Sequence, residues 1–164
     1  MRTDGLSKTL TRIFSELVHG THPKGGFVLN PGDIGLVKSL DKLSAADASR
    51  SAHDGATIAA HAQHVRYGLS LMNEWAATGG NPFADAKWDA AWKISHVDDG
   101  EWQDIRNGLR QETERWQHAL GTPREVVDLE LMGIVGSIAH IAYHLGAIRQ
   151  INKDTRGPKE GTSP

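Results

Sequence analysis

The sequence feature that most constrains the fold is a long apolar run near the C-terminal end of the chain. No charged residue occurs between positions 131 and 148, and this run contains His140 and His144. At 3.6 residues per turn, two residues four positions apart lie on one face of a helix, one turn apart. The segment Thr-Pro-Arg-Glu at 122–125 has the pattern of a capping box with proline at the first helical position. We therefore predict a helix over residues 122–151 that directs two imidazoles toward the core.

Two imidazoles on one apolar face need partners for their ring nitrogens. A buried imidazole without a partner loses the hydration free energy of its nitrogen atoms. A divalent metal ion would satisfy both rings at once. The alternative is a pair of core histidines that are satisfied by Ser137, by the backbone or by each other. His140 and His144 are accordingly the first candidates for metal ligands.

Composition limits the classes of protein to which the chain can belong. With 164 residues it has the length of one domain that can bury its own core. It has no cysteine, so any metal must be held by nitrogen and oxygen ligands. A net charge of -2 gives no electrostatic footprint for nucleic acid or for an anionic membrane surface. We interpret the apolar run as a core helix rather than a membrane span, and we expect a cytoplasmic setting.

Hydrophobic periodicity predicts an all-α fold. Apolar residues recur at helical spacing over 6–18, and turn signals follow this segment. Short helices are expected over 36–43 and 45–51, and long ones over 57–77, 98–121 and 122–151. Four long helices indicate a four-helix bundle that spans residues 1–152. The polar segment 153–164 is expected to be disordered.

The last predicted helix carries a second apolar stripe, formed by Ile134, Ile138, Ile141 and Leu145. One bundle core needs only one stripe from each helix. The second stripe could be covered by the long first connection or by another copy of the chain, and a homodimer is therefore a hypothesis.

A third metal ligand is expected from the second long helix. His61 and His64 lie one turn apart on its presumed inner face, and either one could complete a triad with His140 and His144. The other one would then line the mouth of the site. The remaining histidines fall in connections, at a helix end or on polar faces, and we interpret them as surface residues: His19, His22, His53, His96 and His118.

These segments resemble the DinB/YfiT-like superfamily of metalloenzymes. The resemblance rests on the histidine in the second helix after Thr57 and on the His-x-x-x-His of the last helix, and it covers nearly the whole chain. It implies an up-down-down-up bundle, often dimeric, with a divalent metal on three histidines. Carried over by position, the ligands are His64, His140 and His144, since His64 is seven residues after Thr57. His61 becomes a neighbour of the site, and the metal would be zinc, nickel or iron.

The resemblance also implies an activity, that of a metal-dependent S-transferase for bacillithiol, mycothiol or a related thiol. The partners would be that small thiol and an electrophilic substrate. Tyr67 is a candidate hydrogen-bond donor to a developing anion, or else a core tyrosine. Helical geometry turns Arg66 and Arg149 away from the histidines.

Two alternatives to the transferase remain open. One is a non-catalytic dimeric binding or stress-response module that acts through its apolar stripe. The other is a metal-dependent hydrolase that uses the same ligands. For this reaction Glu130 is the nearest acidic residue on the last helix, two turns or more from His140.

Overall fold

The computed structural model describes residues 1–159, and within this range the fold is all-α, with no β-strand. The four long helices are α1 (Asp4–His19), α4 (Ile58–Thr78), α6 (Asp99–Gly121) and α7 (Asp128–Ile151). The shorter helices are α2 (Gly35–Asp41), α3 (Ala45–Ala48), η1 (Pro82–Asp85), α5 (Asp89–Trp92) and η2 (Lys153–Thr155). The predicted all-α class is confirmed.

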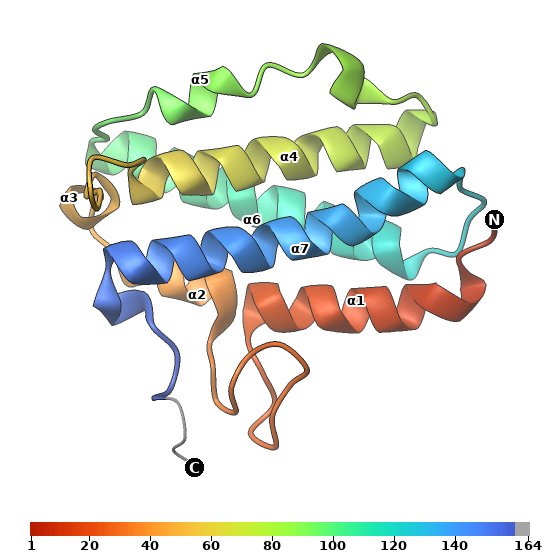
Figure 1. Cartoon of the computed structure of the whole chain (residues 1–164), viewed down its shortest axis with the longest axis horizontal. Helices are drawn as coiled ribbons and strands as arrows, with labels where there is room; N and C mark the ends of the chain where they lie inside the picture. The colour runs from red at the N-terminus through yellow and green to blue at the C-terminus, as the bar shows by residue number, and fades with distance from the viewer. Residues whose placement is uncertain (160–164) are drawn as a thin grey trace.

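The four long helices lie side by side. α4 packs against α6 and α7, and α1 packs against the same two helices from the opposite side. Figure 1 shows α1 and α7 running in one direction and α4 and α6 in the other. The connection between α4 and α6 carries η1 and α5 and returns the chain along the length of α4, so that two consecutive long helices can run in parallel.

Local capping determines where three helices begin, close to the starts predicted at positions 45, 57 and 98. The Thr57 side chain accepts a hydrogen bond from the Ala60 backbone at the start of α4. Asp98 with Glu101 at α6 and Ser44 with Asp47 at α3 form complete capping boxes. Each cap satisfies backbone N–H groups that have no partner inside the helix.

The predicted start of the last helix at 122–125 is wrong. α7 begins at Asp128, and Val127 caps it without a side-chain hydrogen bond. The preceding segment is extended and pairs with the N-terminus of the chain: Thr3 N donates to Arg124 O at 3.0 Å, and Val126 N donates to Met1 O at 2.8 Å. This pairing satisfies backbone groups that a first helical turn would leave without partners.

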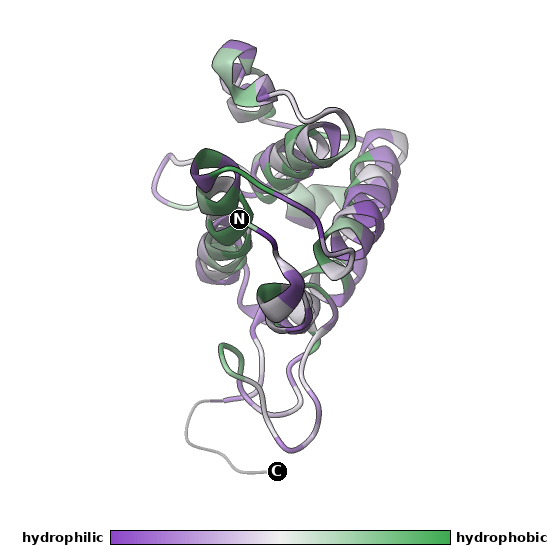
Figure 2. Cartoon of the chain, turned by 90° about the vertical axis from the view of Figure 1, so that its right-hand side faces the viewer, coloured by the Kyte–Doolittle hydropathy of each residue, from purple (hydrophilic) through white to green (hydrophobic). Residues whose placement is uncertain are grey.

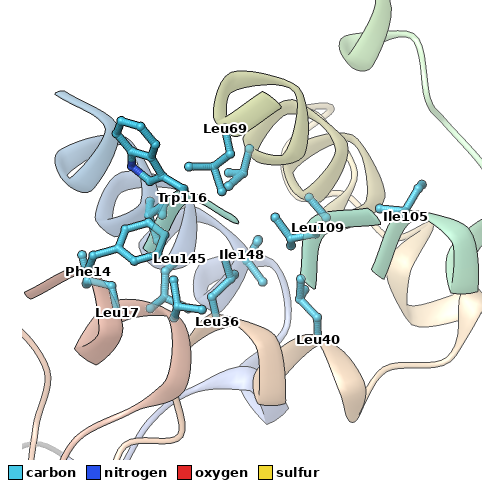
Figure 3. Packing of buried hydrophobic residues seen from close by; sticks show 14 of the residues in the cluster. Phe14, Leu17, Leu36, Leu40, Leu69, Ile105, Leu109, Trp116, Leu145 and Ile148 are labelled. Carbon is cyan, nitrogen blue, oxygen red and sulfur yellow. The ribbon is translucent and has the colours of Figure 1, made fainter. Parts of the chain in front are cut away.

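The core lies between the four long helices and α2. Figure 3 shows Phe14 and Leu17 of α1, Trp116 of α6, and Leu145 and Ile148 of α7 directed toward one another, and all five side chains are almost completely buried. Burial of each large apolar side chain contributes about 1.5–3 kcal/mol.

The interpretation of the second apolar stripe needs correction. Ile134, Ile138, Ile141 and Leu145 are buried in the core of the domain itself. The uncovered apolar side of α7 is instead formed by Met132, Val135 and Tyr143, which are 67%, 54% and 70% exposed. Figure 2, which looks along the long helices, shows α7 hydrophobic over most of its surface.

By length and composition alone, α7 is long and apolar enough to cross a membrane. The core helix of a helical bundle also meets these two criteria.

The expected disordered tail is ordered at its beginning. Lys153–Thr155 form η2, Thr155 is buried, and Arg149 donates hydrogen bonds both to Thr155 O and to the buried carboxylate of Asp33. Residues 160–164 of that tail lie outside the described residues.

Candidate metal centre

Four of the nine histidines gather between α4 and α7. His61 and His64 are three positions apart on α4, and His140 and His144 are four positions apart on α7, so each pair lies on one face of its helix. The other five histidines are exposed, as predicted. Because α4 and α7 pack against each other, the two faces meet.

The structure brings His64, His140 and His144 together as a group that could hold a metal ion. Their ligand atoms all lie within 4.8 Å of one another. The Nε2 atom of His140 is 3.0 Å from Nε2 of His64 and 2.9 Å from Nε2 of His144. His64 and His144 are 8% and 2% exposed, and His140 is partly buried.

This arrangement of nitrogen atoms fits a cation better than it fits hydrogen bonding. A neutral imidazole nitrogen has either one proton or one lone pair in the ring plane, so His140 Nε2 cannot make good hydrogen bonds to both neighbours. A tetrahedral zinc ion with bonds of about 2.0–2.1 Å holds its nitrogen ligands about 3.3 Å apart. A small outward rotation of the rings would provide that spacing.

Burial and mutual proximity keep these rings neutral. Burial, with the neighbouring His140 and His61, lowers the pKa of His64 to about 4. Burial, with His140, His61 and His64, lowers the pKa of His144 to about 3. The pKa values of His61 and His140 are also lowered by burial. At neutral pH the Nε2 lone pairs are therefore available to a metal.

His61 lies behind the triad rather than in it. Its Nδ1 is 2.9 Å from Nδ1 of His144, on the side of that ring opposite to Nε2. If His144 uses its Nε2 lone pair as a ligand, its Nδ1–H donates to the Nδ1 lone pair of His61. Such outer hydrogen bonds fix the tautomer and the orientation of a ligating imidazole. The corresponding atom of His64, Nδ1, is buried and has no hydrogen-bond partner among residues 1–159.

Two tryptophans from the connection after α4 cover the histidines. The Trp92 ring lies 4.2 Å from the His64 ring, tilted by 30°, and the Trp88 ring lies 5.2 Å from it. Tyr67 helps to hold this segment, because its hydroxyl oxygen accepts a hydrogen bond from Lys87 N at 3.0 Å. Trp92 is 41% exposed, so the cover is open to solvent on its outer side.

No family model, no curated protein and no solved structure matches this chain.

Three other residues considered in the sequence lie away from the triad. Arg66 packs over Gly108 of α6, and Arg149 pairs with Asp33 at 2.7 Å, so both are directed away from the histidines as predicted. Glu130 is buried and pairs with Arg124 at 2.6 Å near the start of α7. It is therefore engaged elsewhere and does not serve as a base at the site.

The sequence reasoning missed the roles of Trp88 and Trp92. Neither residue was among the predicted site residues. The usable signal was their spacing of four residues within a short segment between two long helices.

Proposed function

We propose that this chain is a metal-binding four-helix bundle of the DinB/YfiT-like type, with His64, His140 and His144 as ligands. The observation that carries the proposal is the convergence of three Nε2 atoms, 2.9 Å and 3.0 Å apart, in a buried cluster. The directions of the four long helices support an up-down-down-up bundle. Zinc, nickel and ferrous iron all accept imidazole nitrogen, so all three remain candidates.

The activity that we propose is thiol S-transfer. A divalent metal on three neutral imidazoles keeps its full charge and, when bound, would lower the pKa of a thiol. In the overall reaction the thiolate sulfur bonds to the electrophilic carbon. The leaving group departs with the electron pair of its bond, and the thiol proton passes to solvent. The proposed setting is the cytoplasm, where small thiols are kept reduced.

The residues of the chain supply binding and orientation in this scheme. His61 fixes the ring of His144, and Trp92 and Trp88 limit the access of water to His64. Tyr67 positions the connection that carries both tryptophans, through its hydrogen bond with Lys87.

Hydrolysis with the same ligands is supported less well. Among the described residues, the group of ligating side chains consists of histidines alone. A general base has to come within hydrogen-bond reach of the attacking water, and the carboxylate of Glu130 is held by Arg124 instead.

A non-catalytic dimeric module remains the second candidate. The observation that favours it is the exposed apolar stripe of α7, formed by Met132, Val135 and Tyr143. We propose that a second copy of the chain covers this stripe. A dimer is compatible with either function.

Elemental analysis of untagged protein tests the metal proposal. We expect about one divalent metal ion per chain after reconstitution. His64→Ala, His140→Ala and His144→Ala should each remove it, whereas exposed His118→Ala should not. A metal-free parent after reconstitution, with triad variants that are only destabilised, would show that these are structural histidines. If metal is present, thiol consumption with test electrophiles decides between enzyme and module.

A further inference from the structure

An apolar cavity of about 230 Å³ lies directly beside the metal centre. It is formed between α4 and α7, next to the connection that carries η1. Its walls include Leu69, Met72, Phe83, Trp88, Gly133 and His140. His140 thus borders the cavity and also belongs to the triad.

Two glycines keep this space open. A Cβ atom at Gly133 would lie 3.4 Å from both Met72 and Trp75, and a Cβ atom at Gly68 would lie 3.4 Å from the His140 ring. Both positions are inside helices, where glycine costs roughly 0.5–1 kcal/mol relative to alanine. The open space is therefore maintained at the expense of helix stability.

The lining of the cavity is uncharged and mostly apolar, and it includes the aromatic rings of Phe83 and Trp88. No Asp, Glu, Lys or Arg occurs among the described residues that line it. The Ser137 hydroxyl accepts from Trp116 Nε1 at 3.0 Å and donates to Ile134 O at 2.7 Å, so it is already satisfied. The rings of Phe83 and Trp88 lie 5.7 Å apart, within the range of favourable aromatic contacts.

We propose that this cavity binds an uncharged aromatic ring, and that the ring is part of the electrophilic substrate of the metal centre. A dry cavity of roughly 150 Å³ accommodates benzene, so the observed volume fits one substituted ring. A charged group there would lose its hydration without a partner. A substituent on the ring reaches past His140 to the triad. The role as a substrate rests on the proposed function, whereas the binding of the ring does not.

Methionine methyl NMR measures this binding directly. The chain has three methionines. Met72 lines the cavity, whereas Met132 is 67% exposed and is not among the residues that line it, so Met132 is an internal control. Benzyl alcohol is the neutral probe, and benzylammonium is its charged counterpart of nearly the same shape. Both are titrated into zinc-loaded and zinc-free protein, and the metal content of each sample is measured.

We expect benzyl alcohol to shift the Met72 methyl signal saturably, with a dissociation constant of about 1 mM, and to leave Met132 unchanged. Benzylammonium should bind at least about tenfold more weakly. Gly133→Leu should abolish the shift and Gly133→Ala should weaken binding, because both fill the cavity. Gly146→Leu and Gly146→Ala are matched controls on the same helix, since a Cβ there meets no atom of the described residues within 4 Å. Both variants should bind as the parent does.

These measurements distinguish a failure of the aromatic site from a failure of the proposed metal-dependent function. If zinc binds but Met72 does not respond, or if Met72 and Met132 respond alike, the aromatic site is wrong and the metal centre stands. If Met72 responds in a protein that never retains metal, the cavity stands and the proposed function falls. Equal binding by the Gly133→Ala and Gly146→Ala variants would also overturn the cavity as the site.

Discussion

At the scale of single residues, His61 is the side chain whose role the structure changes most. The sequence left His61 and His64 as alternatives for the third ligand, and the structure places His61 against Nδ1 of His144. We expect His61→Ala to weaken zinc binding about 10–100-fold without abolishing it, which is the usual effect of losing an outer hydrogen bond to a ligand. Competition with a chromophoric chelator measures this, with His118→Ala as the control. A complete loss of zinc, equal to that of His64→Ala, would instead make His61 a ligand.

The neutral state of His64 and His144 makes the stability of the metal-free protein depend on pH. Their pKa values are about 4 and about 3 in the fold, against 6.5 for an ordinary histidine. Between pH 6.5 and 4 the unfolded chain binds protons that the folded chain does not. The free energy of unfolding is therefore greatest above pH 6.5 and decreases as the pH falls, by up to about 1.4 kcal/mol per pH unit for each histidine.

Urea denaturation of chelator-treated protein between pH 7.5 and 5 tests this expectation. His144→Gln should flatten the pH dependence, because it removes one of the histidines whose pKa is lowered, whereas exposed His118→Gln should leave the pH dependence unchanged. A parent protein whose stability is constant over this range would contradict the assignment of neutral buried imidazoles.

At the scale of elements, the loop between α1 and α2 is held by one buried carboxylate. Glu16 accepts backbone hydrogen bonds from Phe27, Val28 and Leu29 at 2.7–2.8 Å. Burial alone would raise its pKa, but these hydrogen bonds lower the pKa below its usual value. We expect Glu16→Gln to lower the free energy of unfolding by about 2 kcal/mol, because the amide NH2 group would then face backbone N–H donors. Urea denaturation measures the loss, and exposed Glu114→Gln should change stability by less than about 0.5 kcal/mol. An equal effect of both variants would contradict this role.

Some helix starts and parts of the candidate site could be predicted from the sequence, and others could not. The starts of α4 and α6 could be predicted at positions 57 and 98 because they depend on capping residues within one turn. The start of α7 was predicted incorrectly, because the segment before it pairs with Met1 and Thr3, which are more than 120 residues away in the sequence. The convergence of the histidines followed from helical spacing on two helices. The position of Trp88 and Trp92 over the histidines could not be predicted in this way, because the placement of a connection depends on tertiary packing.

At the scale of the whole molecule, the open question is what covers α7. A helix that is apolar nearly all round has no periodicity that identifies its core stripe. The sequence therefore left the buried Ile134 stripe to be covered either by the first connection or by another copy of the chain. The exposed stripe of Met132, Val135 and Tyr143 borders the candidate metal centre, since the Tyr143 ring lies 5.0 Å from that of His144. Covering it with a second copy would bury apolar surface and shield one side of the site.

We expect the parent protein to sediment as a dimer of two 17.8 kDa chains at micromolar concentration. Val135→Lys places a charge in the middle of the stripe and should weaken the dimer roughly 100-fold, because the lysine would be buried without a partner. Gln111→Lys adds the same charge to the outer face of α6 and should leave the dimer intact. Sedimentation equilibrium distinguishes these results. A parent that stays monomeric at tens of micromolar, or two variants that behave alike, would mean that the exposed face of α7 is not a dimer interface.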